Sequence, residues 1–252
     1  MLALAAAAVL EARRTRLAWF AGGLALLLLS GSLFARSLAL TEAHRLQLAL
    51  LAPAVRLAAV GAVCLHVLAS LVREAQDRTT EYLLAVDLSR TEYLLGKALG
   101  YLAVATLACT VLWLPLAALA PWPAALAWLA SLVLECWIVA AAALFCAVSL
   151  RQVLAGAGFV LGAYLLARWL AAVQLTARAS PFTQPGPLQD ALEWLLQGLA
   201  LLLPGLDRFT PTAWLLEAAP GPDRLAGLAL EAMISSAVLL AAALVDLYRR
   251  ED

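Results

Sequence analysis

Long apolar runs constrain this chain more than any other feature of its sequence. A membrane-spanning helix needs about 20 predominantly apolar residues, because the bilayer core offers no water to its backbone polar groups. The chain has 252 residues, 65% of them hydrophobic and 13% charged. Soluble domains have about 45–50% apolar and about 25% charged residues. The sequence therefore predicts an all-α integral membrane protein with six transmembrane helices and one sizeable polar loop.

The polar breaks between the apolar runs set the expected order of elements. Residues 1–16 are apolar first and basic afterwards, which predicts an interfacial helix, or alternatively only the frayed basic start of the first span. Six spans are then expected at roughly Leu17–Ala35, Leu48–Val72, Tyr93–Ala120, Ala124–Leu150, Val153–Val173 and Ala226–Leu247. The whole chain, residues 1–252, forms one transmembrane domain in this interpretation.

Residues 174–225 differ in kind from the other connections. Seven prolines break this stretch: Pro181, Pro185, Pro187, Pro204, Pro211, Pro220 and Pro222. The apolar run Leu188–Leu203 between them is too short to cross comfortably, and Pro204-Gly205 stops it. We expect a broken helical segment here, re-entrant or interfacial, before the last span.

The distribution of basic residues predicts the orientation. With the N-terminus inside, the inner side holds ten Lys and Arg residues and the outer side or outer half holds seven. Both termini and the polar segment 73–90 would then be cytoplasmic, and residues 174–225 would face outward.

The segment 73–90 is the one long polar stretch between two strongly apolar runs. It mixes charges of both signs with apolar residues at helical spacing, including Leu83 and Leu84. This pattern predicts a short amphipathic helix on the membrane surface. Such a helix suits binding by a partner in the water phase.

Ionisable side chains inside the expected spans form a second candidate site, because each costs about 2.5–3.5 kcal/mol in hydrocarbon on insertion scales. They are Arg56, His66, Glu135, Arg168 and Glu231. Judged by depth at about 1.5 Å per residue, the pairs Glu135–Arg168 and Arg56–Glu231 are possible. These side chains either line a substrate path, or only hold the helices together or reach the outer headgroups.

Signals of soluble-enzyme chemistry are missing from the sequence. Gly96-Lys97 resembles the end of a phosphate loop, but the preceding glycine and the following Ser or Thr are absent. The histidines have no metal-like spacing to an acid or a cysteine, and the four cysteines fall inside apolar runs. The net charge of zero argues against a nucleic-acid partner. We expect no catalytic, cofactor or metal site in this chain.

The polar segment also resembles a known family. REAQDRTTEYLLAVDLSRTEYLLGKALG is similar to the cytoplasmic segment of permease subunits of the type-2 ABC exporter class, which typically reads RE…GT-x-x-x-LL-x-x-P-x-SR…GK. The matching residues are Arg73, Glu74, Thr79, Leu83, Leu84, Ser89, Arg90, Gly96 and Lys97. Arg78 stands where the family has Gly, and its usual Pro is replaced. The stretch LLPGLDRF, residues 202–209, resembles permeases of multicopper-enzyme maturation, including that of the nitrous-oxide-reductase copper-processing exporter.

This resemblance implies a role and partners. It implies a homodimer of this permease in a bacterial inner membrane, bound to an ABC ATPase subunit that carries the ATP and Mg. Segment 73–90 would be the coupling helix that transmits ATP-driven closure of the ATPase to the spans. The ATPase-coupling residues would be Glu74, Thr79, Glu81, Leu83, Leu84, Ser89 and Arg90.

Two other functions compete with a transport permease. A membrane enzyme acting on lipid would use Glu135, His66 or Glu231, and would need these side chains to converge on one cavity. An ion-coupled transporter without an ATPase would need inverted repeats. The sequence shows no convincing self-similarity of that kind.

Overall fold

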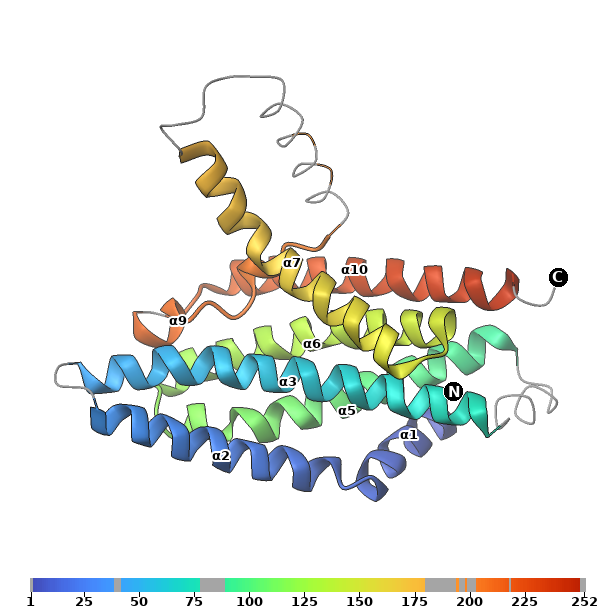
Figure 1. Ribbon diagram of the computed structural model, residues 1–252, viewed down its shortest axis with the longest axis horizontal. Coiled ribbons are helices and arrows are strands. Elements are labelled where there is room, and N and C mark those ends of the chain that lie inside the picture. The colour runs from blue at the N-terminus through green and yellow to red at the C-terminus, as the bar shows by residue number, and fades with distance from the viewer. Residues whose placement is uncertain are drawn as a thin grey trace.

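The computed structural model describes residues 2–38, 42–77, 89–179, 194, 198, 203–217 and 219–249. All the secondary-structure elements among these residues are helices (Figure 1). Six of the helices are long and apolar enough to cross a membrane. The prediction of an all-α multi-pass membrane protein with six spans is confirmed.

The helices differ in length but follow the expected order. They are α1 (Leu2–Arg14), α2 (Leu17–Leu38), α3 (Ala43–Gln76), α5 (Arg90–Ala117), α6 (Trp122–Leu150), α7 (Val153–Ala179), the 3₁₀ turn η1 (Leu206–Arg208), α9 (Ala213–Leu216) and α10 (Pro222–Arg249). The candidate spans are α2, α3, α5, α6, α7 and α10. The short helix α1 is separate from the first span, because the backbone turns at Arg16, which has a left-handed φ of 57°.

The spans run along the long axis of the molecule and define two ends (Figure 1). The start of α1 and the end of α10 lie at the same end as the end of α3 and the start of α5. We call this the inner end and the opposite one the outer end, after the orientation expected from the basic residues. The η1 turn and α9 lie toward the outer end, between α7 and α10 in the sequence.

Helix α6 forms the centre of the bundle. It packs against α3, α5, α7 and α10, and 67% of its most apolar window is buried, against 17% for α2 and 22% for α10. Alanines supply much of its buried surface: Ala124, Ala125, Ala127, Ala140, Ala141, Ala143 and Ala147. Small residues let neighbouring backbones approach closely, which is the main source of helix packing in a bilayer. The large exposed apolar side chains of α2, α7 and α10 face outward from the bundle.

Local signals explain where the helices around the polar segment begin and end. Ser89 caps α5 through a capping box with Glu92, in which the Ser89 hydroxyl accepts from the Glu92 N–H and the Glu92 carboxylate accepts from the Ser89 N–H. Helix α3 continues through Gln76, and α5 begins at Arg90. The connection is therefore residues 77–89 rather than 73–90, because both spans extend beyond their apolar runs.

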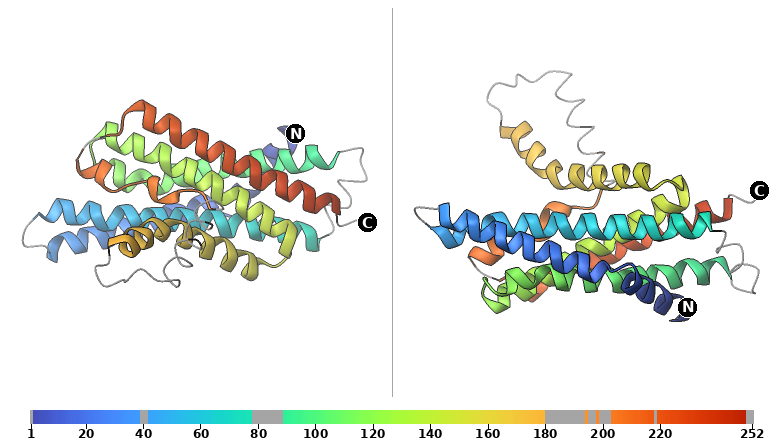
Figure 2. Two further views of the ribbon diagram at one scale, coloured as in Figure 1. Left: turned by 90° about the horizontal axis from the view of Figure 1, so that it is seen from above. Right: turned by 60° about the horizontal axis from the view of Figure 1, so that its bottom comes forward.

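Helix α7 departs from the bundle along its length. It starts beside α6 and its second half swings away from the other spans (Figures 1 and 2). Gly158 and Gly162 on α7 have no neighbour within 4 Å of an added Cβ atom, whereas Gly156 lies against Leu68 of α3. Helix α7 therefore contacts the bundle through one narrow face. The predicted helix Leu188–Leu203 lies almost entirely outside the described residues.

Candidate functional site: two buried polar clusters

The outer cluster is built around the carboxylate of Glu135 on α6. Its side chain is fully buried, and its Oε1 atom lies 3.0 Å from the Arg168 guanidinium of α7, which is 14% exposed. The hydroxyl of Tyr164 donates to the same oxygen at 2.8 Å. The predicted pair Glu135–Arg168 is thus present, at the matched depth that the sequence indicated. A buried carboxylate with a charged partner and further donors avoids most of the penalty of desolvation.

The same cluster holds a short segment that precedes α10. We call residues 203–217 the strap. Arg168 donates to two of its carbonyls, those of Leu206 at 2.7 Å and Phe209 at 3.0 Å. The hydroxyl of Thr210 donates to the second oxygen of Glu135 at 2.8 Å, and the N–H of Thr210 donates to the Ser131 hydroxyl at 3.0 Å. Backbone groups that lack helical partners are therefore satisfied by side chains of the spans.

The prediction of a second ion pair, between Arg56 and Glu231, is wrong. Both side chains are described, and no ion pair joins them within the described residues. Arg56 instead donates to the Thr210 carbonyl at 3.4 Å, and Glu231 accepts from the Gly205 N–H at 2.9 Å. The two side chains bind different parts of the strap, because its backbone groups without helical partners take up their hydrogen bonds in place of a direct ion pair.

This geometry restricts what the Glu135 carboxylate can do. Both oxygens receive donors, from Arg168 and Tyr164 on one side and from Thr210 on the other, and the side chain is fully enclosed. A general base must be within reach of the proton that it abstracts. Here Glu135 has no free oxygen facing a cavity, so the arrangement fastens the strap to α6 and α7.

The inner cluster joins α3 to α5 at the start and end of the connection 77–89. Glu74 on α3 forms an ion pair with Lys97 on α5, and their side chains are 16% and 5% exposed. The Tyr93 hydroxyl donates to the other oxygen of Glu74 at 3.2 Å. Lys97 is the only lysine of the chain, and its burial against a carboxylate shows that it is not a surface charge.

A second row of contacts brings helix α1 into the inner cluster. The Tyr101 hydroxyl donates to Ser70 at 3.0 Å, and the Ser70 hydroxyl donates to Glu11 of α1 at 2.7 Å. The ring of His66 lies edge-on to Tyr101 at 6.4 Å, and its Nε2 atom is buried without a hydrogen-bond partner among the described residues. His66 thus sits beside this cluster, far along α3 from Arg56.

Spacing in the sequence could have revealed both clusters. His66, Ser70 and Glu74 recur every four residues on α3, and Tyr93, Lys97 and Tyr101 recur every four residues on α5. Residues four apart share a helix face. The same spacing separates Ser131 from Glu135 on α6 and Tyr164 from Arg168 on α7. Sequence analysis missed Thr210, since nothing in its neighbourhood shows that the strap folds back onto the bundle.

The predicted coupling residues fall partly outside the described part of the chain. Thr79, Glu81, Leu83 and Leu84 belong to residues 78–88, which the structure does not describe. Of the others, Glu74 lies in the last turns of α3, Ser89 caps α5 and Arg90 is the first residue of α5.

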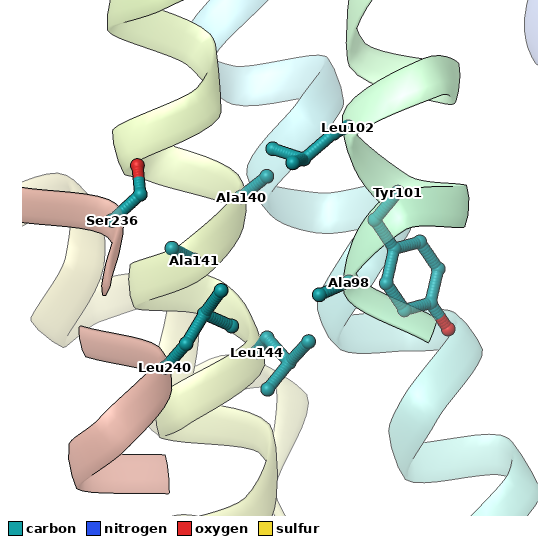
Figure 3. Close-up of a pocket in the computed structure, with 8 residues that line it drawn as sticks. All are labelled: Ala98, Tyr101, Leu102, Ala140, Ala141, Leu144, Ser236 and Leu240. Carbon is teal, nitrogen blue, oxygen red and sulfur yellow. The ribbon is translucent and has the colours of Figure 1, made fainter. Parts of the chain in front are cut away.

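The crevice between α5, α6 and α10 is apolar apart from two side chains (Figure 3). The hydroxyl of Tyr101 points away from it toward α3, and Ser236 contributes the other polar atom. No polar groups converge there as a ligand site would require. In the described residues, no group of three or more His, Cys, Asp or Glu side chains is arranged to hold a metal ion.

Comparison with known proteins adds no relative to these observations. No protein-family model matches the chain, and no curated protein matches it. Helix length and hydropathy identify it as a multi-pass membrane protein.

Proposed function

We propose that this chain is the transmembrane permease subunit of an ATP-driven exporter, and that a separate ATPase chain binds the connection 77–89. The buried ion pair between Glu74 and Lys97 carries this proposal. These two residues belong to the RE and GK dipeptides at the two ends of the pattern that resembles the coupling segment of type-2 ABC exporters. The pattern thus has a physical meaning, because it fastens both ends of the connection to each other.

A fastened connection suits the transmission of force. A push on an unfastened loop would be absorbed by changes in its own backbone. Here the connection leaves α3 just after Glu74 and enters α5 through the Ser89 capping box, and Glu74 and Lys97 are locked together. Displacement of the connection would therefore move α3 and α5 jointly. Helix α1 would follow, since Glu11 is bonded to Ser70.

The partners and location belong to the same proposal. The ATPase subunit would hold ATP and Mg, and the permease would act as a homodimer in a bacterial inner membrane with both termini in the cytoplasm. The likeness of residues 202–209 to copper-related maturation permeases supports export of a species used in metal-enzyme assembly. In the structure these residues overlap the strap, which binds the buried charges of the bundle.

The two competing functions receive less support from the geometry. A lipid enzyme would need Glu135, His66 and Glu231 at one cavity, but Glu135 is enclosed by its donors and His66 lies beside the inner cluster. An ion-coupled transporter would use a titratable side chain along a path, and Glu135 is held by the cation of Arg168.

The proposal is tested by co-expression of this chain with candidate ABC ATPase subunits of the same genome and by their co-purification. Leu84→Asp should abolish co-purification of the ATPase that binds the unaltered chain, because apolar anchors dominate the binding of a helix in a groove. Glu81→Gln is the matched control and should change assembly little, since exposed ion pairs contribute about 0–1 kcal/mol. If Leu84→Asp leaves assembly and permease-stimulated ATP hydrolysis intact, the proposed function is wrong.

A second variant separates coupling from assembly. Lys97→Met should leave the ATPase bound but lower permease-stimulated ATP hydrolysis several-fold, because the ends of the connection are no longer locked together. Arg249→Met is the control, since Arg249 is an exposed cation in the last turn of α10, at the same end of the bundle. Equal losses of stimulation in both variants would show that the ion pair has no special part in coupling.

A further inference from the structure

Thr210 is held more completely than any other residue of the strap. Its side chain is fully buried and its backbone is left-handed, with a φ of 47°. Its N–H, hydroxyl and carbonyl bind Ser131, Glu135 and Arg56 respectively. A left-handed conformation is unusual for a β-branched residue and persists only where the surroundings enforce it. The spans therefore hold Thr210 in a conformation that it would not keep alone.

The strap as a whole is attached to four spans by polar contacts. These come from Arg56 on α3, Ser131 and Glu135 on α6, Arg168 on α7 and Glu231 on α10. Leu206, Phe209, Trp214 and Leu215 of the strap are buried and add apolar contact. Hydrogen bonds to the strap can be exchanged for bonds to water when it moves out, whereas apolar packing has no such replacement. All of these polar contacts fall on residues 205–210 of the strap, so this part is suited to release and re-binding, whereas Trp214 and Leu215 anchor the remainder.

We propose that residues 205–210 of the strap close the outer end of the bundle as a releasable unit, with Trp214 and Leu215 remaining packed, and that Thr210 is the latch. This inference rests on the proposed permease function for its purpose, since a transport path must open at one end while it is closed at the other. Release would free the strained backbone of Thr210, which offsets part of the lost hydrogen bonding. Relief of this strain reduces the free-energy difference between the closed and open forms.

The test measures how often the strap leaves its site. The full chain, with its four native cysteines replaced and Leu206→Cys introduced, is reconstituted into phosphatidylethanolamine–phosphatidylglycerol vesicles. A membrane-impermeant maleimide is added, and the population with the outer end exposed is followed. Leu206 is 3% exposed, so the thiol reacts when the strap is released. Three variants are compared with this parent: Thr210→Val, Thr210→Ser and Thr106→Val.

Each variant isolates one feature. Thr210→Val keeps the shape but removes the donor to Glu135, so labelling should accelerate about tenfold, the change produced by about 1.4 kcal/mol. Thr210→Ser keeps the hydroxyl and should stay within about twofold of the parent. Thr106→Val is the matched control, because Thr106 also makes two hydrogen bonds within the bundle, to Leu102 and from Trp137. It should leave labelling unchanged.

Two results would overturn the latch. One is unchanged labelling in Thr210→Val, and the other is equal acceleration in Thr106→Val, which would indicate general loosening. Hydrogen exchange on the unmodified protein gives a measurement that needs no variant. Strap amides of residues 205–210 should exchange at least about tenfold faster than those of α6 around Glu135. Equal protection of strap and α6 would also overturn the proposal.

Failure of the proposed function gives a different pattern of results. Labelling without ATPase depends only on the strap. When the ATPase and Mg-ATP are added, the labelling rate should change if the permease function is right. Fast labelling in Thr210→Val with no effect of Mg-ATP on any variant would support the latch and refute the permease.

Discussion

Removing Arg168 should damage the protein more than removing the charge of its partner Glu135. The change considered is Arg168→Gln, compared with Glu135→Gln and with both changes together. Arg168→Gln leaves a fully buried carboxylate without its cation and leaves the carbonyls of Leu206 and Phe209 without their donor. In Glu135→Gln, Arg168 can still donate to both of these carbonyls. The amide oxygen of the new glutamine can still accept from the Tyr164 hydroxyl.

The magnitudes follow from these partners. Breaking a buried ion pair by removing one member costs about 3–5 kcal/mol, so Arg168→Gln should lower the free energy of unfolding by about that amount. Glu135→Gln should cost about 1–3 kcal/mol, because Arg168 is partly exposed and keeps its other acceptors. The double variant leaves no orphaned charge. Its cost should be smaller than the sum of the single costs by about 1–3 kcal/mol.

The assay is reversible denaturation of the purified protein in mixed micelles, followed by the loss of helical circular dichroism. The four proteins of the double-mutant cycle are compared at the same detergent and lipid composition. Costs that add within about 0.5 kcal/mol would show that the two side chains are energetically independent. That result would refute the contribution of the ion pair to the fold.

An exchange of the two charges gives a sharper version of the same test. E135R combined with R168E restores opposite charges, but it should not restore stability. The carbonyls of Leu206 and Phe209 would then face a carboxylate, which can only accept hydrogen bonds. Full recovery by the exchange would mean that the strap contacts of Arg168 contribute little.

The remaining predictions concern helix packing and topology. Gly100→Ala should displace α1 and lower the free energy of unfolding by about 1–3 kcal/mol, because the new Cβ would lie 2.6 Å from Cβ of Ala8. Gly158→Ala is the control, because an added Cβ there has no neighbour within 4 Å. It should leave the midpoint of denaturation nearly unchanged. Single cysteines at the exposed positions Gln76 and Glu217 should react with an impermeant maleimide from opposite sides of the membrane, and reaction of both from one side would overturn the expected topology.

The class of fold follows from the amino-acid sequence alone. Apolar runs of about 20 residues allow one satisfactory environment, the bilayer, and one backbone form within it that needs no neighbour, the helix. For this reason the six spans could be located from composition. Their ends were less certain, since α3 and α5 continue past their apolar runs to Gln76 and from Arg90. Polar residues at a helix end are satisfied by caps and headgroup water, so apolar length underestimates helix length.

One ion pair could also be predicted from the sequence, because the depth of each residue along its span was enough to identify its partner. Glu135 and Arg168 lie on consecutive antiparallel spans, so their distances from the shared turn at residues 151–152 place them side by side. The same reasoning failed for Arg56 and Glu231, which lie on spans far apart in the chain. Depth gives one coordinate, whereas pairing also requires the rotation of each helix and its neighbours.

The partners of the buried charges depend on how the helices pack against one another. The strap lacks apolar periodicity. Its left-handed position is occupied by Thr210 and not by glycine, so the sequence does not mark it as a turn. Its conformation is selected by donors and acceptors from α3, α6, α7 and α10, which come together only after the bundle has formed. Contacts between residues distant in the chain depend on the simultaneous packing of several helices. No local pattern of residues encodes that packing.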